Sequence, residues 1–172
     1  CLQTGFLGTS ILMQTLTDNG MQDIAYELLF QRKNPSWLYS VDNGATTIWE
    51  RWNSYMKDKG MGPRGMNSFN HYAYGAIGEW LYRVVAGLEI DEECPGYKHA
   101  VISPMTGGSL DYAQGSYESV YGTVASRWER QGDRITLTVQ VPVNAEASII
   151  LEDGAEAVES GLPFKRNNEG RW

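Results

Sequence analysis

The sequence predicts an α+β chain of two packed units, a helical unit followed by an antiparallel β unit. Up to about residue 86, apolar residues recur at the three- and four-residue spacing of helices. From residue 110 to residue 151 they alternate at every second position, which is typical of half-buried strands. We expect two domains, over residues 1–95 and 96–172, and this order of elements argues against a βαβ fold.

Two helices are expected at the start of the chain, over residues 5–19 and 21–31. Each carries apolar residues that share a face at i,i+4 spacing, and Asn19-Gly20 supplies the end of the first helix. The apolar residues are Ile11, Leu12, Met13 and Leu16 in the first helix and Ile24, Leu28 and Leu29 in the second.

A short third helix is expected over residues 45–52, where Ile48 and Trp52 are four residues apart. The residues before it, which include Trp37, read as a loop. The segment 57–66 contains three glycines and a proline, so it is predicted to be a loop as well.

A longer helix is expected from Asn67 or Ser68, either of which can cap it, to about residue 85, where Gly87 ends it. On this helix one stripe would carry His71, Gly75 and Glu79. The small Gly75 would leave open space above the side chain of His71.

Four strands are expected in the second unit, over residues 110–118, 122–129, 135–141 and 146–151. Residues 131–134, Gln-Gly-Asp-Arg, predict a hairpin turn between the second and third strands. Pro142 is expected at a strand end, because proline cannot donate to the ladder.

The composition describes a folded protein that favours a neutral ligand. Of the 172 residues, 42% are hydrophobic and 20% are charged, and the formal net charge is −7. This charge argues against nucleic acid as a partner, because its binding needs clustered lysine and arginine, and it disfavours an anionic membrane surface for the same reason. No apolar run approaches the roughly eighteen residues that span a bilayer.

The two cysteines, Cys1 and Cys94, exclude a framework of disulfides. Acidic neighbours argue against a reactive thiolate at Cys94. The sequence begins with cysteine and shows no signal-like segment. We therefore expect it to be a piece of something longer, and it indicates no compartment.

A dense group of aromatic residues between positions 37 and 82 predicts a sugar site. Glu50 lies between Trp49 and Trp52, and His71 lies among tyrosines. Flat rings cover the C–H faces of a pyranose, and a few polar groups bind its hydroxyls. We interpret Glu50 as the candidate catalytic group for proton transfer and His71 as a group that binds the substrate.

These residues also have structural interpretations, which the spacing alone leaves open. Glu50 would then be a surface carboxylate paired with Arg51 or Lys57, and His71 a residue at a helix start bonded to a carbonyl. No metal site or other cofactor is predicted, because His71 and His99 are the sole histidines and no ligand stands at the right spacing. Nucleophilic catalysis by serine is not predicted either, because the sequence has no Gly-x-Ser-x-Gly elbow.

Two runs, Gly-Ala-Thr-Thr-Ile-Trp-Glu-Arg-Trp-Asn-Ser over residues 44–54 and Asn-Ser-Phe-Asn-His-Tyr-Ala-Tyr-Gly-Ala-Ile-Gly-Glu-Trp-Leu-Tyr over 67–82, are specific when found together. They closely resemble the bacterial α-L-rhamnosidases of glycoside hydrolase family 78. Shorter segments resemble the same family, so the likeness covers nearly the whole chain: residues 4–9, 18–20, 115–117, 121–122 and 141–145.

The resemblance implies that the helices are the last part of an (α/α)6 barrel and that the strands form a β-sandwich after it. It implies hydrolysis of terminal α-L-rhamnosyl residues with inversion, and a rhamnosylated glycoside or oligosaccharide as the ligand. In inverting hydrolysis one carboxylic acid protonates the leaving oxygen while a carboxylate activates water. Glu50 matches the family's general base, His71 matches a histidine that contacts the sugar, and Trp49 and Trp52 match the base or wall of the pocket.

One part of the family pattern is missing. The family's acidic run, similar to Asp-Cys-Pro-Gln-Arg-Asp-Glu-Arg and carrying the general acid, does not occur in these 172 residues. We therefore expect half of an active site, little or no activity, and self-association through exposed helix faces. Two alternatives stay open: a carbohydrate-binding or interaction module, and another (α/α)6 glycosidase or lyase acting on a different sugar.

Overall fold

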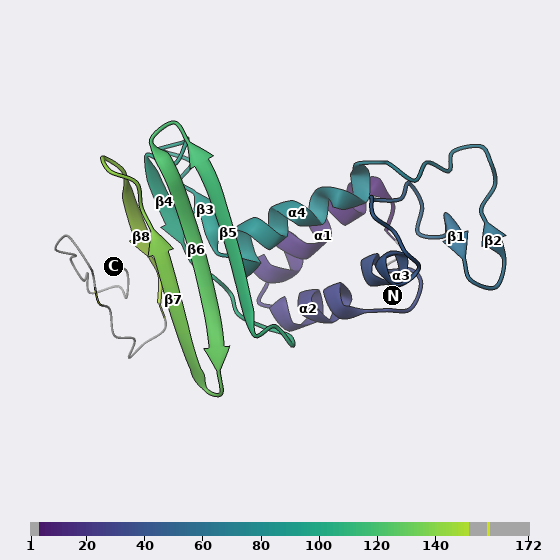
Figure 1. Cartoon of the computed structure of the whole chain (residues 1–172), viewed down its shortest axis with the longest axis horizontal. Coiled ribbons are helices and arrows are strands. Elements are labelled where there is room, and N and C mark those ends of the chain that lie inside the picture. Colours follow the sequence, from purple (N-terminus) through teal and green to yellow (C-terminus); the bar gives the residue numbers. More distant parts are fainter. Residues whose placement is uncertain (1–3, 152–157, 159–172) are drawn as a thin grey trace. The chain divides into compact units, whose positions relative to one another are not determined.

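The computed structural model describes residues 4–151 and 158 (Figure 1). The chain forms two compact units, Cys1–Trp80 and Leu81–Trp172, each with its own internal packing. Helices dominate the first unit and strands dominate the second, which confirms the predicted fold class. The domain limits 1–95 and 96–172 stay a prediction.

Helix α1, Phe6–Asp18, buries a face on which the apolar pattern marked Met13 but not the two threonines. Its buried residues are Thr9, Met13 and Thr17, four residues apart, whereas Ile11 is 63% exposed. The threonines can be buried because their hydroxyls are bonded: that of Thr17 donates to the carbonyl of Met13 and accepts from the indole of Trp80. Gly20, with φ +71°, ends the helix as predicted.

Helix α2, Gln22–Phe30, follows at once and packs against α1. Its buried residues are Ala25 and Tyr26, and the predicted apolar face was wrong in one place, since Ile24 is 46% exposed. Helix α3, Trp37–Asp42, was predicted as loop. It forms because the buried Ser36 caps it, accepting the backbone N–H of Tyr39 at 3.0 Å.

The predicted helix over residues 45–52 is wrong. This segment has turns and bends, and the short strands β1 (Tyr55–Met56) and β2 (Gly60–Met61) follow it. Its backbone forms bonds far along the sequence, because the carbonyl of Ile48 accepts the N–H of His71 at 2.8 Å. The i,i+4 spacing of Ile48 and Trp52 therefore does not reflect a helix.

The fourth predicted helix exists but starts later than expected. It begins at Ala73 with a 3₁₀ turn, η1 (Ala73–Ala76), and continues as α4 (Ile77–Trp80), which ends the first unit. His71 precedes the helix, so the expected stripe of His71, Gly75 and Glu79 with open space above the histidine is wrong. A Cβ on Gly75 would instead meet Ile48 at 3.4 Å.

The second unit begins with one helical turn, η2 (Leu81–Val85), and then forms two three-stranded sheets. The first sheet has the order β3-β4-β8 and the second the order β5-β6-β7. The strands are β3 (Leu88–Ile90), β4 (His99–Ile102), β5 (Tyr112–Ser119), β6 (Gly122–Gln131), β7 (Arg134–Gln140) and β8 (Glu146–Ile149).

The four predicted strands correspond to β5, β6, β7 and β8, and the turn at 131–134 joins β6 to β7. Two features were missed: β3 has three residues, too few for an alternation to show, and β4 pairs with β8 in parallel. Leu88, Ile102 and Val124 lie in a core between the two sheets, with Leu137 and Val139 packed against it. The unit is thus a small sandwich whose remaining strand pairs are antiparallel.

Candidate functional site

The candidate site is built on two short segments, 48–50 and 68–71, that run side by side in the first unit. The N–H of Glu50 donates to the carbonyl of Ser68 at 2.9 Å, and the N–H of His71 donates to the carbonyl of Ile48 at 2.8 Å. The hydroxyl of Thr47 donates to the carbonyl of Phe69 between them. This ladder brings Glu50 and His71 onto neighbouring segments without the helices that the sequence predicted.

Glu50 is half-buried and its carboxylate is anchored. Oε2 accepts the backbone N–H of Ser68 at 2.7 Å, so Glu50 and Ser68 exchange two hydrogen bonds. In the described part of the chain, neither Arg51 nor Lys57 forms an ion pair with Glu50. The carboxylate is therefore held by a backbone donor, and no ion pair to it is found among residues 4–151.

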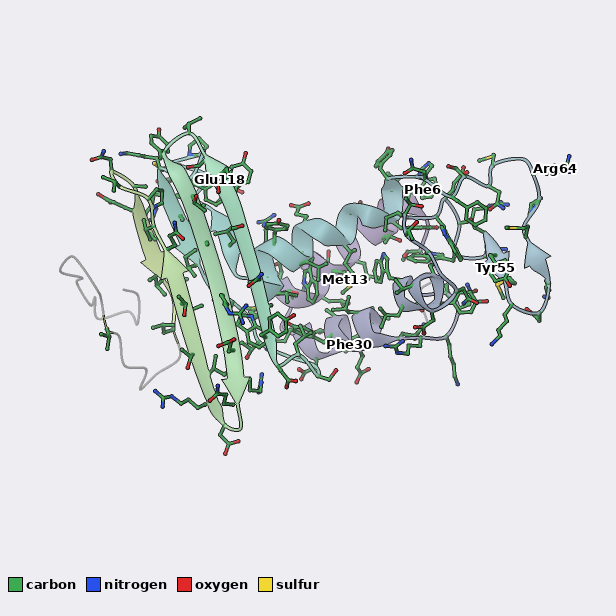
Figure 2. All side chains as sticks on the ribbon, in the orientation of Figure 1. Phe6, Met13, Phe30, Tyr55, Arg64 and Glu118 are labelled. Carbon is green, nitrogen blue, oxygen red and sulfur yellow. The ribbon has the colours of Figure 1, made fainter. Side chains whose placement is uncertain are left out.

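His71 is held between two rings and a backbone donor. Its Nδ1 accepts the N–H of Ala73 at 3.2 Å, so in the neutral ring the proton lies on Nε2. Phe6, labelled in Figure 2, stacks on His71 with 4.9 Å between centroids and 22° between planes, and Tyr72 stacks at 5.3 Å and 9°. The ring orientation is thus fixed, and Nε2 is the nitrogen available as a donor.

The two tryptophans beside Glu50 have different environments. Trp49 is 6% exposed and lies edge-on to Phe69, with 5.3 Å between the ring centroids. Trp52 is half-buried, stacks on Tyr74 at 3.8 Å, and donates its indole N–H to the carbonyl of Thr4 at 3.2 Å. Both are fixed in place by packing, as a pocket floor requires.

A hollow of about 260 Å³ lies along the tryptophans. Its wall includes both predicted tryptophans together with Trp37, Arg51 and Tyr74. Glu50 and His71 are not among its lining residues; the structure places the two tryptophans at this hollow, and Glu50 and His71 on the two hydrogen-bonded segments 48–50 and 68–71. Burial raises the pKa of the Tyr74 hydroxyl, and the nearby charge of Arg51 partly offsets this rise.

Three wall residues were not predicted from the sequence: Trp37, Arg51 and Tyr74. Trp37 and Tyr74 lie inside the aromatic stretch, and the indole N–H of Trp37 donates to the carbonyl of Tyr74 at 2.8 Å. Nothing in their spacing shows this contact across 37 residues. The density of aromatic residues was the sole available indication.

The described residues contain no group of three or more histidine, cysteine, aspartate or glutamate side chains placed to hold a metal ion. In the same part of the chain, no helix has the length and apolarity needed to cross a membrane.

Comparison with known families accounts for nearly the whole chain. Residues 1–85 match the bacterial alpha-L-rhamnosidase six-hairpin glycosidase domain, and residues 87–162 match the bacterial alpha-L-rhamnosidase C-terminal domain. The runs over 44–54 and 67–82, which carry all four predicted site residues, lie inside the first match.

Individual relatives agree with these matches. An alpha-L-rhamnosidase from Streptomyces avermitilis is 47% identical over 148 residues, which cover 86% of this chain and 14% of the relative. One from Alteromonas sp. is 46% identical over 149 residues, covering 87% of this chain and 16% of the relative.

A solved structure, that of the Streptomyces avermitilis alpha-L-rhamnosidase complexed with L-rhamnose, aligns with a TM-score of 0.86 at 44% identity. The alignment covers 99% of this chain and 16% of that protein, so the chain spans about one sixth of the enzyme's length. From two matching domains and these relatives, we conclude that the chain belongs to the bacterial alpha-L-rhamnosidase family.

Proposed function

We propose that this chain supplies the general base and part of the sugar pocket of an inverting α-L-rhamnosidase. Glu50 is the base, His71 donates from Nε2 to a sugar hydroxyl, and Trp49 and Trp52 form the base or wall of the pocket. The observation that carries the proposal is the carboxylate of Glu50, which is anchored by the Ser68 N–H and lies on the segment that is hydrogen-bonded to the one carrying His71. The ligand is a rhamnosylated glycoside or oligosaccharide.

The chemistry requires two carboxyl groups on opposite faces of the sugar. A carboxylic acid protonates the leaving oxygen, and the base takes a proton from the water that attacks the anomeric carbon, with roughly 6.5–9.5 Å between the two groups. The acidic run that carries the acid in this family does not occur among these 172 residues. We therefore expect the isolated chain to have little or no rhamnosidase activity.

A hybrid enzyme tests the role of Glu50. The chain replaces the matching segment of the Streptomyces avermitilis enzyme, and turnover of an aryl α-L-rhamnoside is measured. Glu50→Gln should lower kcat by about 1,000-fold, because general base catalysis contributes roughly 10²–10⁴. Glu27→Gln, the same charge change on the exposed side of α2, should leave kcat unchanged.

Two results would contradict the proposal. The base assignment fails if the Glu50→Gln hybrid turns over within threefold of the unmodified hybrid. The prediction that the chain holds half of an active site fails if the isolated chain hydrolyses the substrate at a rate that Glu50→Gln abolishes. The general acid would then lie within these residues.

A further inference from the structure

We propose that Asn67 and Ser54 act as positioning residues for Glu50, an inference that rests on the proposed function. The anchored carboxylate depends on one donor, the backbone N–H of Ser68. The position of that donor depends in turn on the loop that leads into residue 68. A base that must aim at one water molecule needs this loop to be held firmly.

Ser54 joins this loop to the turn that carries Glu50. Its side chain is fully buried, and its Oγ accepts the N–H of Arg51 at 3.2 Å while its own N–H donates to the carbonyl of Arg51 at 3.1 Å. The Ser54 carbonyl accepts Nδ2 of Asn67 at 3.2 Å and the N–H of Gly62 at 2.8 Å. One residue therefore ties the turn after Glu50 to the residue before Ser68. We call Ser54 and Asn67 the brace.

The brace leaves little room for adjustment. A Cβ on Gly62 would lie 3.2 Å from Nδ2 of Asn67 and 3.3 Å from the carbonyl of Ser54, closer than most such contacts. The neighbouring Met66 has φ +53°, a left-handed conformation that disfavours a side chain. Such strain persists where the surroundings over-determine the backbone, and it collects at functional sites.

Asn67 also buries a polar atom at a cost. Its Oδ1 is buried and has no hydrogen-bond partner among the described residues. An unpaired buried acceptor is unfavourable for folding, so the Nδ2 hydrogen bond to the Ser54 carbonyl is what favours an amide at this position. An aspartate here would turn an acceptor toward that carbonyl.

The first experiment measures the brace in the chain alone, by hydrogen exchange. Asn67→Asp should speed exchange of the Ser68 and Glu50 amides, whose hydrogen bonds link the two segments, with little change at α2. Asn53→Asp is the matched control, because it adds the same charge at an exposed side chain in the same turn. Unchanged exchange at Ser68 in Asn67→Asp would refute the brace, whatever the enzyme's activity.

The second experiment measures the consequence for the reaction, in the hybrid enzyme described above. Asn67→Asp should lower kcat by about 100-fold, the cost of a misplacement near 1 Å, while KM stays within about twofold. Asn53→Asp should match the unmodified hybrid. Gly62→Ala, which displaces the Asn67 amide without changing its chemistry, should lower kcat in the same direction by a smaller factor.

Azide separates a positioning role from a general loss of structure. Azide can attack the anomeric carbon in place of water; the bond to the leaving oxygen breaks, that oxygen takes the proton of the general acid, and an inverted glycosyl azide forms. No base is required, so azide should restore turnover in Asn67→Asp and in Glu50→Ala alike. A damaged fold would not be rescued.

The outcomes distinguish the two proposals. Full activity of Glu50→Gln overturns the proposed function, whereas a wild-type kcat in Asn67→Asp together with an inactive Glu50→Gln overturns the brace alone. Absence of azide rescue in Asn67→Asp, where Glu50→Ala is rescued, also overturns it.

Discussion

Asp91, His99 and Ser148 form a hydrogen-bonded row in the second unit. A carboxylate oxygen of Asp91 lies 2.6 Å from Nδ1 of His99, and Nε2 of His99 lies 3.0 Å from the hydroxyl of Ser148. These are the residue types of a serine hydrolase triad. Ser148, however, lies within β8, opposite Val101 in the register, and not on a strand-to-helix elbow. The row is a structural link between β4 and β8.

This link gives stability a pH dependence whose sign follows from Asp91. The hydrogen bond with His99, followed by the backbone N–H of Glu93, lowers the pKa of the Asp91 carboxyl. The stabilisation is therefore present above the ordinary aspartate value of about 3.9 and is lost as the pH falls through the lowered value. Thermal unfolding between pH 6 and pH 2.5 should show a smaller decline in Asp91→Asn than in the unmodified chain. Identical declines would contradict the link.

Two glycines show how much a helix end depends on its surroundings. Gly20, after α1, and Gly87, after η2, have φ values of +71° and +70°. A Cβ on Gly20 meets nothing within 4 Å, whereas a Cβ on Gly87 would lie 2.1 Å from the backbone nitrogen of Pro104. The same conformation therefore carries different steric constraints.

The substitutions Gly20→Ala and Gly87→Ala form a matched pair. Gly20→Ala should lower the free energy of unfolding by about 1 kcal/mol, the cost of the left-handed conformation. Gly87→Ala adds a backbone clash and should cost about 3 kcal/mol or more. Urea denaturation measures both, and equal losses would contradict the role given to Pro104.

At the scale of elements, the sequence predicted the strands and turns that are determined by residues close together in the chain. Strand β6 could be predicted because buried residues alternate along it with half-buried ones, and Gly132 permits the turn between β6 and β7 with φ +62°. The segment 45–52 could not be predicted this way. Ile48 and Glu50 form backbone hydrogen bonds with His71 and Ser68, and no local period encodes a contact of that kind. The same holds for the parallel pairing of β4 with β8.

For the candidate site, too, the sequence predicted the residues but not the contacts between distant parts of the chain. Glu50, His71, Trp49 and Trp52 were predicted as site residues from residue types and the two family-like runs, and their roles stay a prediction. The geometry of these residues was not predicted, because the expected helices would have placed His71 on a helix stripe. The brace could not be predicted from the sequence either. Asn67 was predicted as a helix cap and instead donates to the carbonyl of Ser54.

At the scale of the whole molecule, the exposed apolar side chains of α1 predict self-association. Leu7 is 87% exposed and Ile11 is 63% exposed, four residues apart on one helix face. Contiguous apolar surface of this kind mediates contact between proteins. Sedimentation velocity should show a mass that rises with concentration in the isolated chain.

Positive charge at positions 7 and 11 should weaken the expected self-association. Leu7→Lys with Ile11→Lys should shift the chain toward monomer, whereas Val120→Lys, at a position 90% exposed in the turn between β5 and β6, should not. If the unmodified chain is a monodisperse monomer up to about 100 μM, the prediction of self-association is contradicted. An association with a Kd above that concentration contributes little binding free energy.

Thr4 and Phe6, which flank the N-cap residue Gly5 of α1, both contact residues of the proposed sugar site. Thr4 receives the indole N–H of Trp52, and Phe6 covers one face of the His71 ring. A truncation that removes Thr4 and Phe6 would therefore take away contacts to Trp52 and His71 while leaving both family-like runs, 44–54 and 67–82, complete.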